Sequence, residues 1–476
     1  MRGWDAARVA RAAGARLLRG SSSAASEPGP RRATIDSRST APGELFVGLP
    51  GERTDGGRHA PEALRAGAWG VLVTPQHAPA AAEIGAGGVV LSHPDPLEGL
   101  EALARAWRRE LGAGATKVVA ITGSTGKTST KDILAALVSS QLRAVASAEN
   151  LNTEIGLPLT VLGAPSDTDV LVLEMAMRGA GQIAELTAIS EPDVGVIVNV
   201  GPVHLEQLGS LQAIAATKAE LIAGLAPGKT VVIPIDEPLL APHLRPDVRT
   251  LTFGAGADVE LVGRRPDGEV LIRDGARQIV LAPSFRQAHN LRNLLAAVAA
   301  LGALGITPPH RVEVRFSALR GERLVLPGGV VLINDCYNAN PMSMRAAIDE
   351  LAETSPGRRV AVLGDMLELG AGAPRLHREI GEYAAARGVE LLVTVGPLAA
   401  EMRQAFAGQA HSASDTVAAV ELLRTLLRKG DTVLVKGSRG VGLERVAEAL
   451  GSEPEPARER AADAPASAPA AGERRS

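Results

Sequence analysis

The sequence predicts an α/β protein built from three domains, and three observations lead to this prediction. The chain has 476 residues, which is more than one hydrophobic core normally organises. Beyond residue 113, short apolar runs alternate with segments of helical spacing, a pattern typical of mostly parallel sheets with helices on both faces. The composition also breaks at residues 111–115 and 305–309, where glycine or proline accumulates, and the first of these breaks favours a hinge.

These features divide the chain into four consecutive segments. We expect an N-terminal domain at residues 1–112. A central P-loop-type domain is expected at residues 113–308, and a Rossmann-like α/β domain at residues 309–451. Residues 452–476 are mainly Ala, Pro, Glu and Arg, so they bury too little apolar surface to fold and we expect a disordered tail.

Short apolar runs mark the strands of all three domains. Such runs, bounded by turn-forming residues, favour buried strands over helices. Residues 60–66 and 294–301 instead predict helices, the second one apolar throughout. The predicted strands cover residues 71–73, 88–91, 118–121, 170–173, 194–198, 330–333, 360–363, 391–395 and 432–435.

Composition and charge exclude several classes of partner. A net charge of −3 gives no reason to expect nucleic acid or an anionic membrane, and 2% aromatic residues leave little for base stacking. Cys336 is the single cysteine, which excludes an internal disulfide and fits a reducing compartment. No signal peptide is recognisable, and the longest apolar stretch, residues 294–306, is too short to cross a bilayer. We therefore expect a cytoplasmic protein.

A glycine-rich turn at residues 122–129, here called the phosphate turn, carries the strongest signal. It follows a predicted strand and precedes a helix, and this arrangement forms an anion cradle in which backbone N–H groups face a phosphate. Lys127 could reach a terminal phosphate and Thr128 could place its hydroxyl on Mg²⁺. The spacing is Gly-x-x-Gly-Lys-Thr, with Ile121 where the longer P-loop has glycine, so an ordinary turn remains an alternative. The residues of the turn expected to contact nucleotide are Gly123, Ser124, Thr125, Gly126, Lys127, Thr128 and Ser129.

Two polar residues follow other strands of the predicted central sheet. Glu174 ends the run at residues 170–173, and His204 comes shortly after the run at residues 194–198. Because ligands bind at the carboxyl ends of parallel strands, both should lie on the edge that carries the phosphate turn. A carboxylate there could hold Mg²⁺ that bridges nucleotide phosphates. The alternatives are a helix-capping acid for Glu174 and a hydrogen-bonded loop histidine for His204.

Lys218 occupies an unexpected place in a predicted helix. Leu211, Ile214, Ala215 and Ile222 define one apolar stripe, and Lys218 falls on it. A buried lysine has a depressed pKa, so its neutral amine could take up CO₂ and become an anionic carbamate that completes a second metal site. The alternative is that its long side chain reaches the surface.

Polar residues also cluster after later elements. Asn290 and Asn293 are three residues apart, so on a helix they would share a face and could contact a nucleotide base, although helix capping is an alternative. Residues 334–340, 364–370 and 436–440 each follow a predicted strand of the C-terminal domain. Three polar loops at strand ends predict a site that faces the central domain.

Taken together, these motifs resemble the Mur ligases of peptidoglycan synthesis. The resemblance covers residues 33–450 and includes the phosphate turn, residues 150–156, Glu174, His204 and residues 218–220, followed by residues 289–290 and the three C-terminal loops. It implies a three-domain, ATP- and Mg²⁺-dependent ligase that forms an amide bond through an acyl phosphate. Residues 364–370 and 436–439 resemble most the member that joins D-alanyl-D-alanine to UDP-N-acetylmuramoyl-tripeptide. The resemblance then implies a UDP-sugar-binding N-terminal domain, and we expect a monomer.

The resemblance also implies roles for individual residues. Lys127, Glu174, His204 and Lys218 would be catalytic, and Thr128, Glu174, His204 and carbamylated Lys218 would hold metal. Further nucleotide contacts would come from Asn290, Asn293, Arg323, Asp335 and Tyr337. Substrate contacts would come from Ser37, Arg38, Asn152, Thr153, Lys436, Ser438 and Arg439.

Some features leave other functions open. The family commonly has Asp-Gly-His in the first domain, whereas this chain has Asp55-Gly56-Gly57 with His59 nearby. A sister ligase that adds the third stem-peptide residue is an alternative, but its Asp-Asn-Pro-Arg signature is absent. Folyl-polyglutamate ligases share the core. A P-loop ATP hydrolase, or a regulator derived from a ligase, is a further alternative.

Overall fold

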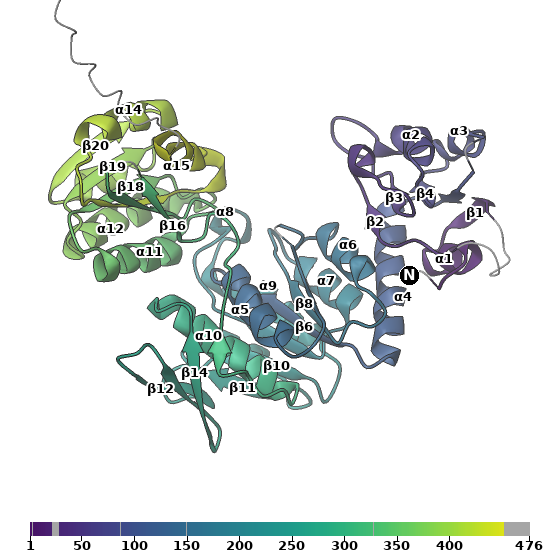
Figure 1. Cartoon of the computed structure of the whole chain (residues 1–476), viewed down its shortest axis with the longest axis horizontal. Helices are drawn as coiled ribbons and strands as arrows, with labels where there is room; N and C mark the ends of the chain where they lie inside the picture. Colours follow the sequence, from purple (N-terminus) through teal and green to yellow (C-terminus); the bar gives the residue numbers. More distant parts are fainter. Residues whose placement is uncertain (2, 21–27, 86, 149, 327, 452–476) are drawn as a thin grey trace, which may run out of the picture.

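A computed structural model describes residues 1, 3–20, 28–85, 87–148, 150–326 and 328–451 of the chain. It contains three sheets, and we call the parts around them the N-terminal, central and C-terminal domains. Figure 1 shows the N-terminal and C-terminal domains on opposite sides of the central one. The predicted α/β fold is confirmed, whereas the predicted disordered tail lies outside the described residues. Within those residues, no helix has both the length and the apolar character to cross a membrane.

The N-terminal sheet has five strands in the order β1-β5-β4-β3-β2. Strands β2 to β5 run parallel and β1 joins β5 antiparallel. The four parallel strands therefore end at one edge, where the loop carrying Ser37 and Arg38 begins. The elements are α1 Ala6–Ala12, β1 Arg16–Arg19, β2 Ala33–Thr34, η1 Ser37–Ser39, β3 Leu45–Val47, η2 Gly56–His59, α2 Ala60–Arg65, β4 Gly70–Val73, α3 Ala78–Ala82, β5 Val89–Ser92 and α4 Pro96–Ala113.

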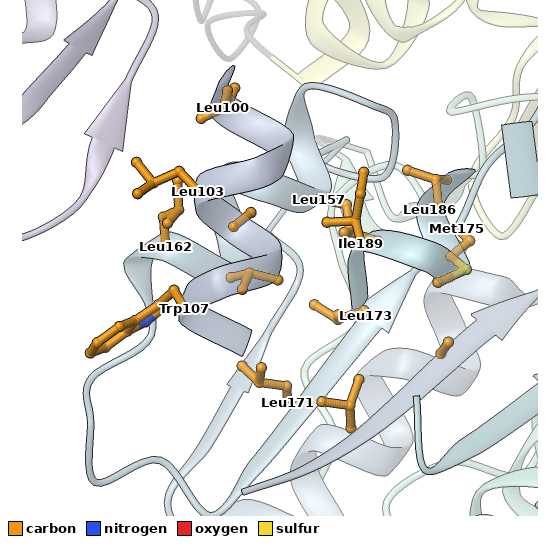
Figure 2. Close-up of a cluster of buried hydrophobic side chains, with 14 of the residues drawn as sticks. Leu100, Leu103, Trp107, Leu157, Leu162, Leu171, Leu173, Met175, Leu186 and Ile189 are labelled. Carbon is orange, nitrogen blue, oxygen red and sulfur yellow. The ribbon is translucent and has the colours of Figure 1, made fainter. Parts of the chain in front are cut away.

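Helix α4 connects the N-terminal domain to the central one. It begins at a strong cap, because the Asp95 carboxylate accepts hydrogen bonds from the N–H groups of Leu97 and Glu98, and Pro96 fits the first helical position. The hinge predicted at residues 111–115 is wrong, since α4 continues to Ala113 and buries Leu111. Figure 2 shows why: Leu100, Leu103 and Trp107 of α4 lie among side chains of the central domain.

The central sheet has ten strands in the order β15-β14-β13-β12-β11-β10-β9-β6-β8-β7. The part from β7 to β12 is parallel, and β12, β13 and β14 form an antiparallel meander. Helices α5 and α10 cover one face, and α4, α6, α7 and α9 cover the other. The elements are β6 Lys117–Thr122, α5 Lys127–Ser139, β7 Ala144–Ala146, α6 Gly156–Gly163, β8 Val170–Glu174, α7 Gln182–Ser190, β9 Val194–Ile197, α8 Leu205–Leu208, α9 Leu211–Gly224, β10 Thr230–Pro234, η3 Pro238–His243, β11 Arg249–Phe253, β12 Val259–Arg264, β13 Val270–Asp274, β14 Arg277–Pro283, α10 Ala288–Ala303 and β15 Arg311–Val312.

The C-terminal sheet has six strands in the order β16-β17-β21-β18-β19-β20, and only β16 is antiparallel. Separate apolar clusters fill its two faces, so this domain has its own core. The elements are β16 Glu322–Leu326, β17 Val330–Asn334, α11 Pro341–Thr354, β18 Arg359–Gly364, η4 Gly370–Gly372, α12 Ala373–Ala386, β19 Leu391–Val395, α13 Ala400–Ala405, β20 Gln409–Ala413, α14 Thr416–Leu426, β21 Thr432–Lys436, η5 Arg439–Val441 and α15 Glu444–Gly451.

Candidate active site

Three neighbouring strands of the central sheet bring the predicted site residues together. Strands β8, β6 and β9 are adjacent and parallel, so their carboxyl ends share one edge. Glu174 is the last residue of β8, the phosphate turn follows β6, and His204 lies beyond the end of β9. The arrangement expected from the sequence is therefore present.

The phosphate turn is held by hydrogen bonds from the loop after β9. The Asn199 side-chain oxygen accepts hydrogen bonds from the N–H groups of Ser124 and Thr125, at 3.1 and 2.9 Å. The Ser124 hydroxyl donates to the carbonyl of Gly201 at 3.0 Å. Asn199 was not predicted as a site residue, although its position directly after a strand was a usable signal.

Gly126 is required where the phosphate turn meets α10. Its φ of 75° is in the left-handed region, and a Cβ there would lie 2.7 Å from Oδ1 of Asn293. Asn293 in turn donates to Oδ1 of Asn290 at 3.4 Å, so the two side chains share one helix face as expected. Neither caps α10, which begins at Ala288 with Gln287 in the capping position.

Glu174 presents an unsatisfied oxygen. Its side chain is buried, and Oε1 accepts a hydrogen bond from the Asn152 amide at 3.0 Å. Oε2 is buried and has no hydrogen-bond partner within the described part of the chain. A buried carboxylate oxygen without a partner is costly, so this geometry suits a cation ligand. Glu174 does not cap a helix, because α7 begins only at Gln182.

Lys218 is buried on α9, as predicted, with 1% of its surface exposed. Leu211, expected on the same buried stripe, is 39% exposed because it is the first residue of the helix. Burial holds the pKa of the Lys218 ammonium well below its usual range, and the charge of Lys127 lowers it further. The amine is therefore not directed into solvent.

Lys127 lies at the centre of a group of charges. Its ammonium donates to the carbonyl of Gly123 at 2.9 Å. Burial lowers the pKa of Lys127, the carboxylate of Glu174 raises it, and the guanidinium of Arg320 lowers it. The charges of Lys127, Glu174, Arg320 and Lys218 are thus electrostatically linked, and we call these four groups the charge cluster.

His204 occupies the capping position of α8 but makes no side-chain capping bond. Its Nδ1 lies 2.5 Å from Oε2 of Glu368, a residue of the C-terminal domain. Burial lowers the pKa of His204, Glu368 raises it, and Lys127 and Lys218 lower it. His204 therefore lies within reach of the charge cluster. Glu368 was part of the predicted loop at residues 364–370 but was not singled out.

The arginine whose charge acts on Lys127 of the phosphate turn is Arg320, whereas the sequence favoured Arg323 for the phosphate side. Arg323, on β16, donates to the Thr354 hydroxyl at 2.9 Å and lies 3.8 Å from a Glu350 oxygen. Arg320 instead stacks on the ring of Tyr337, with its guanidinium carbon 4.0 Å from the ring centre, and its Nε is buried without a partner. The sequence analysis considered only Arg323, which follows Gly321, and not Arg320, which precedes it.

The polar loops of the C-terminal domain are largely bonded to one another. Lys436 is buried, and its ammonium donates to Oδ2 of Asp335 at 2.6 Å and to the carbonyl of Asn338 at 2.9 Å. The buried Ser438 hydroxyl accepts a hydrogen bond from the N–H of Leu367 at 2.9 Å. Arg439 remains exposed, 3.7 Å from Glu444. Of the three residues expected to bind substrate here, only Arg439 presents its polar group to solvent.

Substrate residues expected elsewhere lie at two edges. Ser37 and Arg38 are in the η1 turn after β2, where Arg38 pairs with Asp36 at 2.8 Å, which helps lower the pKa of Asp36 to about 2. Thr153 is exposed, whereas Asn152 is buried against Glu174. In the first domain, Nε2 of His77 lies 2.9 Å from Oδ2 of Asp55. An imidazole is therefore present beside Asp55, although this chain lacks the histidine of the Asp-Gly-His motif.

Among the residues that the structure describes, no three His, Cys, Asp or Glu side chains converge as a ready-made metal site. Any cation at the phosphate turn would need other ligands. The Thr128 hydroxyl, buried at the start of α5, and the orphaned Oε2 of Glu174 are protein groups of the right chemistry, because Mg²⁺ prefers oxygen.

Comparison with known proteins adds two family matches. Residues 121–301 match the model of the Mur ligase middle domain. Residues 310–439 match the model of the Mur ligase glutamate ligase domain. A curated relative from Bacillus subtilis (strain 168), UDP-N-acetylmuramoyl-tripeptide–D-alanyl-D-alanine ligase, is 35% identical and aligns with 87% of this chain and 92% of its own.

Solved structures give the same picture. MurF from Acinetobacter baumannii superposes with a TM-score of 0.84 at 25% identity, covering 94% of this chain and 99% of that one. MurF from Thermotoga maritima, in complex with ADP, superposes with a TM-score of 0.76 at 30% identity, covering 88% and 97%.

Proposed function

The chain belongs to the Mur ligase family, and from this premise we propose that it joins D-alanyl-D-alanine to UDP-N-acetylmuramoyl-tripeptide with conversion of ATP to ADP and phosphate. The observation that carries the proposal is that Glu174, the phosphate turn with Lys127, and His204 follow three adjacent parallel strands at one edge of the central sheet, together with the buried Lys218 on α9. A simple nucleotide switch needs no buried lysine there and no third domain in contact with the site.

The reaction requires two transfers at the same place. The terminal carboxylate of the tripeptide attacks the γ-phosphorus of ATP, and the bond to the β-phosphate oxygen breaks, giving an acyl phosphate and ADP. The amine of D-alanyl-D-alanine then attacks the acyl carbon, phosphate leaves, and the amine loses a proton. Catalysis of this kind is mainly charge neutralisation and positioning.

The residues of the phosphate turn fit the first transfer. Lys127 is placed to neutralise the β- and γ-phosphates. Asn199 fixes the shape of the turn through the N–H groups of Ser124 and Thr125, and the other N–H groups of the turn would face the anion. Arg320 takes the role that Arg323 was expected to have on the phosphate side. Asn290, Asn293, Asp335 and Tyr337 are proposed nucleotide contacts.

We propose that Thr128, Glu174, His204 and Lys218 hold Mg²⁺. The fit rests on the orphaned Oε2 of Glu174 and on the buried amine of Lys218. A neutral Lys218 amine can add CO₂ and release a proton. The product is a negatively charged carbamate, whose oxygen atoms can bind Mg²⁺, whereas the ammonium form of lysine would repel it. When bound, Mg²⁺ would neutralise negative charge on the phosphates.

The outer domains would bring the two substrates to this edge. Ser37, Arg38 and Thr153 are proposed contacts of the UDP-linked acceptor, and Asn152 orients Glu174. The exposed Arg439 is suited to the carboxylate of D-alanyl-D-alanine, because a guanidinium binds carboxylates in a bidentate manner. We propose that the protein acts as a monomer, and the nucleotide substrates fit the cytoplasm.

An omission assay tests the proposed activity. Purified protein with ATP, Mg²⁺, D-alanyl-D-alanine and UDP-muramyl-tripeptide should release phosphate only when all four are present. Parallel reactions with lysine or diaminopimelate as the third residue of the tripeptide would identify the natural acceptor. Equal phosphate release with ATP and Mg²⁺ alone would instead favour an ATP hydrolase.

Substitution of Lys218 tests the carbamate. We expect Lys218→Ala to lower kcat by at least about 100-fold, the size of effect seen when one group that stabilises the transition state is lost. Acetate or formate should restore part of the rate, since a small carboxylate can occupy the space of the carbamate. Lys117→Ala, at an exposed lysine that begins β6, is the matched control. Full activity of Lys218→Ala without added acid would reject the carbamate.

A further inference from the structure

One polar contact joins the candidate active site to the C-terminal domain. Nδ1 of His204 lies 2.5 Å from Oε2 of Glu368, in the loop between β18 and η4. The backbones also meet, because the N–H of Glu206 donates to the carbonyl of Glu368 at 3.2 Å. The side chain and the main chain of Glu368 therefore both contact the loop after β9.

The backbone on both sides of this contact is unusual. His204 has φ of 52° and Glu368 has φ of 62°, in the left-handed region that residues with a side chain seldom adopt. Such conformations persist only where the surroundings impose them, and they cluster at functional sites. Two of the five non-glycine residues with positive φ in the described chain thus face each other across the domain boundary.

Apolar packing supports the same contact. Leu205, next to His204, packs against the central core and against the core of the C-terminal domain. A Cβ on Gly370, two residues after Glu368, would lie 3.4 Å from Cα of Glu206. The two loops are therefore in close contact over several residues, and the His204–Glu368 pair is not an isolated surface pair.

The contact constrains the chemistry of the imidazole. A carboxylate at Nδ1 favours the form with the proton on Nδ1, which leaves the lone pair of Nε2 free. His204 follows β9, which pairs in parallel with β6, so it lies on the same edge of the sheet as the phosphate turn. Histidines that bind metal commonly have this arrangement, in which a carboxylate holds the other ring nitrogen.

We propose that Glu368 is a positioning residue, supplied by the C-terminal domain, which holds His204 with Nε2 available for a divalent cation bound with nucleotide. The proposal rests on the proposed function for the role of His204. It has a consequence for the whole molecule: cation binding and docking of the C-terminal domain favour each other, because the contact exists only when that domain lies against the loop after β9.

The test compares Glu368→Gln and Glu368→Ala with Glu206→Gln, which removes an exposed carboxylate from the same boundary. The first readout is the affinity for Mn²⁺ in the presence of ADP, measured by electron paramagnetic resonance. The second is the tautomer of His204 by ¹⁵N NMR, with its signals identified by their loss in His204→Gln. Neither readout depends on catalytic activity.

We expect both Glu368 variants to bind Mn²⁺ about 10- to 100-fold more weakly, the usual effect of losing a carboxylate behind a metal-binding histidine. The fixed Nδ1–H tautomer should also be lost, and Glu206→Gln should match the wild type. Unchanged Mn²⁺ affinity and an unchanged tautomer in Glu368→Gln would overturn the proposal. A change confined to the KM for D-alanyl-D-alanine would overturn it too, by making Glu368 a substrate contact.

Two further outcomes are informative. Should Glu368→Ala fail to fold, Glu368→Gln decides the matter, because it preserves the shape of the side chain. Should the wild type fail the omission assay while Glu368→Gln still weakens Mn²⁺ binding, the proposed ligase activity falls and the positioning role of Glu368 stands.

Discussion

The two junctions of the central domain are built in different ways. The N-terminal domain is joined through α4, and one continuous apolar cluster extends from Met1 and Trp4 through α4 into the central core. The C-terminal domain has its own two clusters, and Leu205 is the described residue that packs against both a C-terminal and a central cluster. The N-terminal and central domains therefore share one hydrophobic core. The central and C-terminal domains have separate cores and meet mainly through their surfaces.

Hydrogen bonds reinforce the first junction along the length of α4. The Trp107 indole donates to the carbonyl of Ala164 at 3.1 Å, and the buried Arg108 donates to the carbonyl of Ser190 at 2.8 Å. Arg108 also lies 3.2 Å from the carboxylate of Asp193. Because these partners are backbone and buried groups of the central domain, α4 has little freedom to rotate relative to it.

The second junction depends on a few polar contacts of side chains and backbone. Besides the His204–Glu368 pair, the amide of Gln287 donates to Glu350 at 3.0 Å. The linker to the C-terminal domain is held by Ser317, whose N–H donates to Asp132 of α5 at 2.8 Å. Small polar interfaces between domains permit relative motion unless something else fixes them.

The difference between the two junctions indicates that the domains have different mechanical roles. The N-terminal and central domains form one unit, so the acceptor and ATP would keep a fixed relative position. The C-terminal domain would bring its own substrate and complete the site when it docks. Changes at the first junction should therefore affect stability, and changes at the second should affect cation binding and rate.

The largest effect on this comparison is expected from Arg108→Ala. Its guanidinium side chain is 8% exposed, and removing it leaves the Asp193 carboxylate with the ammonium of Lys229 at 2.6 Å and the N–H of Val118 at 2.9 Å. Breaking a buried ion pair usually costs about 3–5 kcal/mol, and since Asp193 keeps these partners we expect about 3 kcal/mol.

Tryptophan fluorescence can measure this loss at one junction alone. All three tryptophans, Trp4, Trp69 and Trp107, belong to the N-terminal domain or to α4, and all are buried. The guanidinium concentration at the midpoint of unfolding, followed by fluorescence, should fall in Arg108→Ala. The part of the circular dichroism transition that belongs to the C-terminal domain should keep its midpoint. Arg109→Ala, which removes an exposed pair with Glu191, should cost less than about 1 kcal/mol. Equal losses in the two variants would contradict a clamped junction.

The sequence predicted well which residues meet at one edge of the central sheet, for a physical reason. Glu174, the phosphate turn and His204 each follow a strand, and parallel strands end at one edge whatever the rest of the fold does. The burial of Lys218 was likewise readable from helical spacing. These inferences need only local periodicity and one rule about sheets.

What could not be predicted depends on contacts between distant segments. The hinge expected at residues 111–115 reflects glycine content, but packing of Leu111 and Arg108 on the central domain keeps α4 helical to Ala113. Lys436 and Ser438 were expected to bind substrate, yet their partners come from loops about 70 to 100 residues away in the chain. Local sequence patterns give the residue types at such positions but do not give the hydrogen-bond partners of their side chains.

A smaller effect on the first junction should come from pH, through Glu101 of α4. Burial raises the pKa of Glu101 to about 8, assisted by a hydrogen bond with the Glu185 carboxyl of α7. The unfolded value is about 4.3, so the folded state binds this proton more tightly. The resulting stability is fully present below about pH 4.3 and is lost as pH rises to about 8.

Glu101→Gln replaces the titrating group with a neutral one of the same shape, so the difference in Tm between this variant and the wild type should grow from pH 5 to pH 9 in favour of the variant. Glu101 is half-buried and screened by solvent, so the effect should be at most about 1 kcal/mol, or about 2–4 °C. Tryptophan fluorescence again reports on the junction between the N-terminal and central domains. Glu98→Gln, at an exposed carboxylate one turn earlier in α4, should give a difference that does not vary with pH. If the difference in Tm between Glu101→Gln and the wild type also stays constant with pH, α4 is held to α7 without a proton shared by Glu101 and Glu185.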